Sequence, residues 1–152
     1  LGVCNGCQVL VRLGLLGPDV RLATNTSGRF ESRFTTVGVS ETVNSPWLKA
    51  LRGCRGLGVW SAHKEGRFVV GPQATCVPAL YYVGPDGKSA MHYPYNPNGS
   101  DCSLAGVSSL DGRHLAMMPH PERSYLGWQC PEGKAADWRR YTAWVRLFTQ
   151  VC

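Results

Sequence analysis

The sequence GVCNG at residues 2–6 constrains the fold of this chain more than any other segment. It places Cys4 between two glycines, after a short apolar stretch and before apolar residues at near-helical spacing. This pattern is typical of a strained turn between a strand and a helix, where neighbours without side chains relieve crowding. The helix dipole at such a turn favours the thiolate over the thiol. We therefore expect an α/β fold with Cys4 as its nucleophile, although an ordinary tight turn beside a buried cysteine would have the same sequence.

The composition is that of a globular protein. The chain has 152 residues, 43% of them apolar, which predicts one domain with a substantial core. We recognise no signal peptide, and no apolar run is long enough to cross a membrane, so no membrane partner is expected. Seven cysteines at irregular spacing predict reduced thiols and a cytoplasmic location. The net charge of +6 comes from dispersed basic residues, which favours a solvated or domain-facing surface and no nucleic-acid partner.

Short apolar and alternating segments predict an α/β domain with a mixed sheet. Strands are expected at residues 33–39, 58–62, 67–70, 80–83, 89–93, 105–109 and 114–118. A turn at residues 64–66 should join the second and third of these strands, and turns at 85–87 and 111–112 should make hairpins of the last four. Pro46 should begin a short helix, and a closing helix is expected over residues 137–151. The apolar face of that last helix would consist of Trp138, Tyr141, Trp144, Val145 and Phe148.

The sequence MMPHPER at residues 117–123 contains the second group of candidate site residues. A strand that runs into two prolines places its last side chains at the carboxyl edge of the sheet, where ligands of open α/β folds lie. His120 and Glu122 are two residues apart and would share one face of an extended segment. Glu122 would then accept a hydrogen bond from one imidazole nitrogen while the other nitrogen faces Cys4, as in a catalytic triad. Taken alone, His-Pro-Glu occurs more often in ordinary loops.

The spacing of Cys4 and Cys7 also fits a redox pair or half of a zinc site. No second C-x-x-C follows, and the four histidines lie at no zinc-like spacing, so no metal site is expected. The redox interpretation lacks its usual βαβ context. We expect Cys7 to be a small buried residue on the helix.

Five separated motifs resemble one known family in order along nearly the whole chain. They are residues 1–8 and 117–123 together with NTSGRFESRF at 25–34, WSAHKEG at 60–66 and YPYNPNGS at 93–100. The chain thus resembles the class I glutamine amidotransferase domain, specifically that of the phosphoribosylformylglycinamidine synthase family in its large single-chain form. The resemblance implies a flavodoxin-like, three-layer glutaminase fold with a mixed sheet. It also implies that residues 1–152 are a C-terminal fragment of a larger multidomain enzyme, with the N-terminal strands missing.

The resemblance implies a role for each matching residue. Cys4 would attack the side-chain amide of glutamine and form a thioester, His120 would transfer the proton, and Glu122 would orient His120. Gln8, Asn5 and His63 are the expected substrate-binding residues. Ammonia would pass to a synthetase domain of the same polypeptide, where ATP and Mg would serve conversion of formylglycinamide ribonucleotide to its amidine. This domain itself would need no cofactor.

Three features depart from the family pattern. Lys64 stands where the family has glycine, and we expect it to be a tolerated, solvent-facing side chain unless the position needs a positive φ. The segment that supplies the second oxyanion amide in the family would precede Leu1, so this fragment alone should be poorly folded or inactive. The segment between Arg12 and Ala23 is short. The competing hypothesis is a catalytically retired homologue that serves as an interaction module, as in some viral tegument proteins, which should have lost triad residues.

Overall fold

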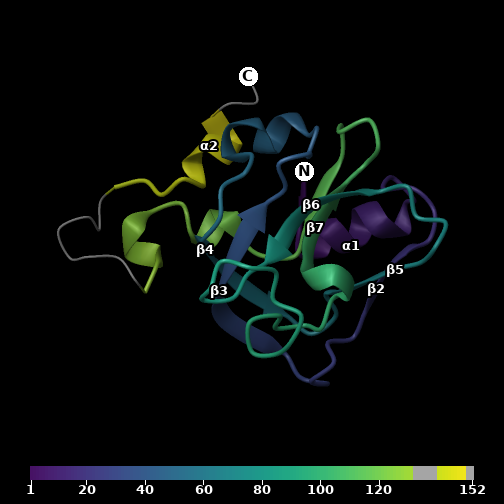
Figure 1. Ribbon diagram of the computed structural model, residues 1–152, viewed down its shortest axis with the longest axis horizontal. Coiled ribbons are helices and arrows are strands. Elements are labelled where there is room, and N and C mark those ends of the chain that lie inside the picture. Colours follow the sequence, from purple (N-terminus) through teal and green to yellow (C-terminus); the bar gives the residue numbers. More distant parts are fainter. Residues whose placement is uncertain (132–139, 150–152) are drawn as a thin grey trace.

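A six-stranded mixed sheet forms the centre of the computed structural model, which describes residues 1–131 and 140–149 (Figure 1). Across the sheet the strands are β1 (Gly2–Val3), β8 (Leu115–Met117), β7 (Leu104–Ser108), β6 (Val77–Tyr82), β3 (Glu31–Val39) and β4 (Leu57–His63). Within this sheet β1 runs parallel to β8, and the other neighbouring pairs are antiparallel. A separate antiparallel pair joins β2 (Val20–Ala23) to β5 (Arg67–Val70). The predicted mixed sheet is therefore confirmed.

Short helical elements connect these strands. They are α1 (Asn5–Arg12), η1 (Pro46–Leu51), η2 (Asp101–Ser103), η3 (Pro121–Arg123), η4 (Gly127–Gln129) and α2 (Val145–Thr149), where η denotes a 3-10 helix. Helix α1 follows β1 directly, as the GVCNG pattern predicts, and Pro46 begins η1 as expected. Strands β7 and β8 form the second predicted hairpin, in which Gly112 has a φ of 76°.

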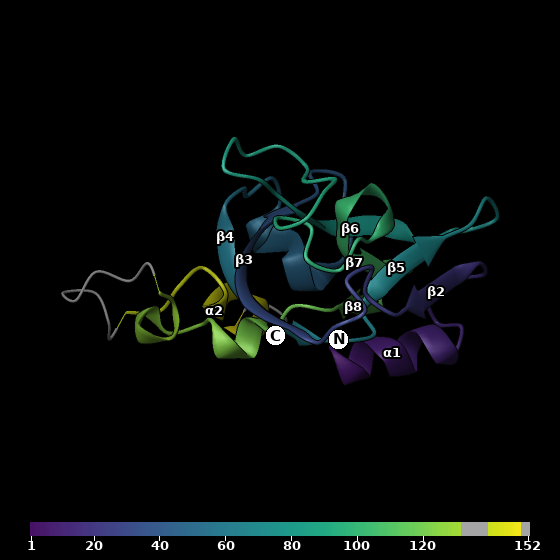
Figure 2. The same cartoon turned by 90° about the horizontal axis from the view of Figure 1, so that it is seen from below.

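Both faces of the central sheet are covered by apolar clusters, and successive side chains of one strand point into opposite clusters. In β8, Leu115 and Met117 pack in one apolar cluster and Ala116 packs in the other. Residues of η1 and the α2 region, including Leu48 and Leu147, complete the first cluster. Residues of α1, β2 and β5 complete the second, and these three elements lie together at one end of the molecule, away from α2 (Figures 1 and 2). This layering agrees with the expected three-layer domain.

The segment at residues 64–66 joins two strands, β4 and β5, as predicted. The two strands belong to different sheets, because β4 pairs with β3 and β5 pairs with β2. One predicted strand is absent. Residues 89–93 form no strand, and the expected pairing is reduced to one bridge between Val83 and Ser89 and one hydrogen bond from Ala90 N–H to Tyr82 O (2.9 Å). The reason is that β3 and β7 pair with β6 along its two edges, which leaves only its last residue, Tyr82, open to the returning chain.

The predicted closing helix is shorter than expected. Helix α2 begins only at Val145, and the expected positions Trp138 and Val151 lie outside the described residues. Trp144 is buried as predicted, but Tyr141 and Phe148 are exposed. Tyr141 precedes the helix and forms a bridge with Leu126, so helical spacing does not apply to it.

Candidate functional site

Cys4 occupies a strained turn between β1 and α1. Its φ of 50° and ψ of −105° are unusual for a residue with a side chain, and such a conformation costs on the order of 1–3 kcal/mol. The backbone is tied on both sides, because Cys4 N–H donates to Met117 O (2.9 Å) and Gln8 N–H donates to Cys4 O (3.1 Å). Sheet and helix together therefore hold the sulfur at the N-terminal end of α1.

The two glycines beside Cys4 have different roles. A Cβ at Gly2 would lie 2.5 Å from Gly6 O and 2.6 Å from a methyl carbon of Leu10, so no side chain fits there. A Cβ at Gly6 would meet no described atom within 4 Å. Crowding explains Gly2, but the expectation that it also explains Gly6 was wrong.

His120 reaches Cys4 from the loop that follows β8. Its backbone N–H donates to Trp60 O (2.7 Å), and its side chain is almost fully buried. The thiol of Cys4 is half-buried and points toward Ala62 O at 3.7 Å. The side-chain interaction with His120 is the main cause that lowers the pKa of Cys4, and the backbone N–H of Asn5 assists. Contact with Cys4 and with Glu122 raises the pKa of His120 to about 9. These directions favour a thiolate–imidazolium pair near neutral pH.

Glu122 lies beside the other nitrogen of the same imidazole. Nδ1–H of His120 donates to Oε1 of Glu122 (2.5 Å), which leaves Nε2 buried and without a hydrogen-bond partner in the described part of the chain. Partial burial works to raise the pKa of Glu122, but the hydrogen bond and positive charge of His120 outweigh it and lower that pKa. The prediction that an extended segment puts both side chains on one face was wrong, because Pro121 begins η3. The turn of that 3-10 helix brings them together instead, with Arg123 N–H donating to His120 O (3.1 Å).

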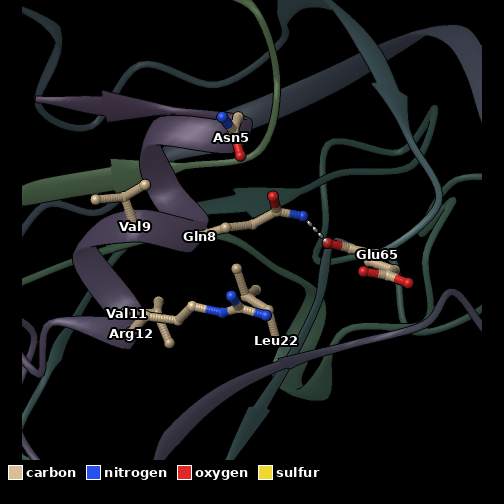
Figure 3. A pocket seen from close by; sticks show the side chains of 7 residues that line it. All are labelled: Asn5, Gln8, Val9, Val11, Arg12, Leu22 and Glu65. Carbon is tan, nitrogen blue, oxygen red and sulfur yellow. Dashed lines mark hydrogen bonds between the residues drawn. The ribbon is translucent and has the colours of Figure 1, made fainter.

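Asn5 and Gln8 border a cavity of about 210 Å³ along α1 (Figure 3). The carboxamide Nε2 of Gln8 donates to the backbone oxygen of Glu65 (2.8 Å), so it links the helix to the turn after β4. Arg12 and Leu22 form the far part of the wall. The residues that line this cavity do not include Cys4, His120 or Glu122, so its connection to the triad is through Asn5, the residue that follows Cys4.

His63 lies at the end of β4, with 3% of its surface exposed. Burial lowers its pKa to about 4, and the positive charge of His120 adds to this effect, so His63 is neutral at physiological pH. Its Nε2 lies 3.1 Å from the carboxamide nitrogen of Asn98. The sequence reasoning missed Asn98, although the YPYNPNGS motif contained it.

Lys64 and Cys7 both lie where the sequence predicts. Lys64 is exposed and has no positive φ, which fits a tolerated side chain. Cys7 is fully buried, as predicted, and burial raises the pKa of its thiol, which argues against a redox pair with Cys4. Within residues 1–131 and 140–149, no cluster of three metal-ligating side chains occurs. No helix of this described part is long and apolar enough to span a bilayer.

Residues 1–152 match the family described as CobB/CobQ-like glutamine amidotransferase domain. A probable phosphoribosylformylglycinamidine synthase (chloroplastic/mitochondrial) of Arabidopsis thaliana is 44% identical over 148 residues, which cover 86% of this chain and 10% of that protein. The phosphoribosylformylglycinamidine synthase of Homo sapiens is 39% identical over 176 residues, which cover 97% of this chain and 13% of that protein.

A solved structure, PurLQS from Thermotoga maritima, superposes on this fold with a TM-score of 0.69 and 28% identity. The match covers 99% of this chain and 58% of that chain. The coverages of the two synthases given above show that the present chain spans about a tenth of the length of the curated relatives it matches.

Proposed function

The chain belongs to the family of CobB/CobQ-like glutamine amidotransferase domains, and from that premise we propose that it is the glutamine-hydrolysing part of a phosphoribosylformylglycinamidine synthase. The observation that carries this proposal is the convergence of Cys4, His120 and Glu122 at the turn between β1 and α1. The ammonia released would serve ATP-dependent conversion of formylglycinamide ribonucleotide to its amidine in purine biosynthesis. That step, with its ATP and Mg, belongs to a synthetase domain of the same polypeptide, which the greater length of the relatives supports.

The first chemical step uses the thiolate of Cys4. Its sulfur forms a bond to the side-chain carbonyl carbon of glutamine, and the π electron pair moves to the carbonyl oxygen. The backbone N–H of Asn5, which already helps to lower the pKa of the thiol, would stabilise the resulting oxyanion. Asn5 and Gln8, at the rim of the cavity, are the proposed contacts for the substrate.

The second step breaks the carbon–nitrogen bond. Nε2 of protonated His120 gives its proton to the leaving nitrogen, so ammonia departs and a thioester remains on Cys4. Water then attacks the thioester while His120 accepts its proton, which releases glutamate and restores the thiolate–imidazolium pair. Glu122 holds Nδ1–H throughout and so keeps Nε2 directed at the reacting atoms.

The retired-homologue hypothesis is disfavoured by the same geometry. All three triad residues are retained, and the lowered pKa of Cys4 matches the needs of a nucleophile. Cys4, Cys7, Cys54, Cys76 and Cys102 form no disulfide in the described part of the chain, which suits a reducing compartment and supports our proposal of a cytoplasmic location.

Replacing Cys4 tests the proposal directly. In the polypeptide that carries this chain, Cys4→Ser should abolish glutamine-dependent synthesis and spare synthesis from free ammonia, because ammonia bypasses the glutaminase step. Cys7→Ser serves as the matched control and should be mild, since Cys7 takes no part in the proposed chemistry. Equal loss with both nitrogen sources, or survival of the glutamine reaction in Cys4→Ser, would contradict the assignment.

A further inference from the structure

Asn98 is fully buried, and its carboxamide orientation is fixed by unambiguous partners. Its Oδ1 accepts from the backbone N–H of Ser100 (3.0 Å) and from the hydroxyl of Ser100 (2.7 Å). Its Nδ2 donates to Gly66 O (2.9 Å). A backbone N–H can only donate and a carbonyl oxygen can only accept, so the amide cannot be reversed.

This orientation determines the tautomer of His63. The second N–H of Asn98 faces His63 Nε2 at 3.1 Å and, at a longer distance of 3.4 Å, the hydroxyl of Tyr82. Because an amide nitrogen cannot accept, Nε2 of His63 must accept and the ring proton must reside on Nδ1. Nδ1 is buried and has no hydrogen-bond partner among the described residues. A Cβ at Gly66 would overlap the His63 ring and Met118, so close packing also holds the ring in place.

The turn that Asn98 holds is connected to the proposed site at two points. Ala62 O lies 3.7 Å from Sγ of Cys4, and Glu65 O accepts from Gln8. A second buried asparagine, Asn25, binds the backbone of the same turn. Its side chain donates to His63 O (2.8 Å), and its backbone N–H donates to Lys64 O (2.8 Å). The turn at residues 62–66 is therefore a rigid bridge between the two motifs at 25–34 and 93–100 and the nucleophile.

We propose that Asn98 is a positioning residue for glutamine hydrolysis: it keeps His63 in the neutral Nδ1–H form and holds the turn whose carbonyls contact Cys4 and Gln8. The inference rests on the proposed function and adds a residue to it. The charged groups that face His63 are His120, from the loop after β8, and Glu31, from the neighbouring strand β3. A proton on His63 would oppose the proton that His120 must carry.

The test compares Asn98→Asp with Asn96→Asp in the polypeptide that carries this chain. In Asn98→Asp a carboxylate oxygen faces the lone pair of His63 Nε2 and Gly66 O, and the repulsion is relieved when the pair of Asp and His63 takes up a proton. The hydroxyl of Tyr82, 3.4 Å from Nδ2 of Asn98, can also donate to the new carboxylate. Asn96 is also buried and caps the same loop through the backbone of Gly99 and Ser100, but it does not touch His63. Both variants therefore change a buried carboxamide to a carboxylate, and only one of them alters His63.

We expect Asn98→Asp to lower kcat/KM for glutamine by about tenfold to a hundredfold, the scale on which small misplacements slow catalysis. Synthesis from free ammonia should be unchanged. The alkaline limb of the glutamine-dependent pH profile should move to lower pH, because a charged His63 lowers the pKa of His120. Asn98→Ser removes the two amide N–H groups without adding charge. It should lower kcat/KM for glutamine and leave the alkaline limb of the pH profile where it is in the parent enzyme.

Failure of the role of Asn98 and failure of the proposed glutaminase function give different results. If the parent polypeptide uses glutamine and Asn98→Asp matches Asn96→Asp in activity and pH profile, the role of Asn98 is refuted and the proposed function stands. The same conclusion follows if Asn98→Asp does not fold and Asn98→Ser is as active as the parent. If the parent does not use glutamine, or if Cys4→Ser still does, both proposals fail.

Discussion

Changing Glu122 to glutamine separates orientation of His120 from proton transfer by His120. The hydrogen bond from Nδ1–H to Oε1 has a charged acceptor, and such bonds contribute about 1.5–3 kcal/mol. The Glu122 side chain is 47% exposed and also lies 3.6 Å from Nε of Arg123, so solvent and a second cation weaken the interaction. We therefore assign this hydrogen bond the lower value, about 1.5 kcal/mol, so Glu122→Gln should lose roughly tenfold in kcat.

The same change should alter the pH dependence. The carboxylate of Glu122 helps to raise the pKa of His120 to about 9. His120 must be protonated to give its proton to the leaving nitrogen, so activity is lost as the pH rises through that pKa. Without the negative charge the pKa of His120 falls, and Glu122→Gln should lose activity at lower pH than the parent enzyme.

The assay is glutamine-dependent turnover across the pH range, with ammonia-dependent turnover measured in parallel. His120→Ala removes the proton donor and should cost more, about a thousandfold or above, as for loss of a central triad residue. Glu41→Gln is a matched control, because Glu41 is an exposed glutamate paired with Arg55 outside the site. A Glu122→Gln enzyme as inactive as His120→Ala would refute a purely orienting role, and an unchanged alkaline limb would refute the electrostatic argument.

Two further predictions concern the turns beside the site. Lys64→Gly should change KM for glutamine less than tenfold, equivalent to about 1.4 kcal/mol, because the side chain is exposed and the position has no positive φ. A rise in glutaminase turnover of about a hundredfold would instead revive the retired-homologue hypothesis. Gly2→Ala should destabilise the fold by about 1–3 kcal/mol through overpacking against Gly6 and Leu10, whereas Gly6→Ala should be neutral or slightly stabilising. Thermal unfolding of both glycine variants measures this contrast, and equal shifts would show that the crowding argument is wrong.

The local elements of this fold were predictable because short-range stereochemistry determines them. Residues 2–6 specify a turn between strand and helix, and Pro46 fixes a backbone angle that suits the first position of η1. Strand pairing is different, because it depends on which strands arrive from elsewhere in the chain. No pattern within residues 58–70 indicates that β4 and β5 belong to different sheets.

In the candidate site, too, local contacts were predictable and contacts between distant segments were not. The sequence predicted that His120 and Glu122 would meet, and they do, although a 3-10 turn brings them together rather than an extended strand. Asn98 lies 35 positions from His63, and its motif resembles an ordinary asparagine–glycine turn. The contact between them became visible only once the two loops were placed against one another in space.

The one parallel pair of the described central sheet explains how nucleophile and base come to meet. Val3 lies opposite Met117 in register, so β1 and β8 end at the same edge of the sheet. Cys4 follows the first strand end directly, and His120 follows the second after two residues. Antiparallel pairing would place the residues that follow the two strands at opposite ends of the ladder. The backbone bond from Cys4 N–H to Met117 O continues this ladder into the turn. The register of two short strands, rather than the sequence of either motif, therefore sets the separation of the thiol and the imidazole.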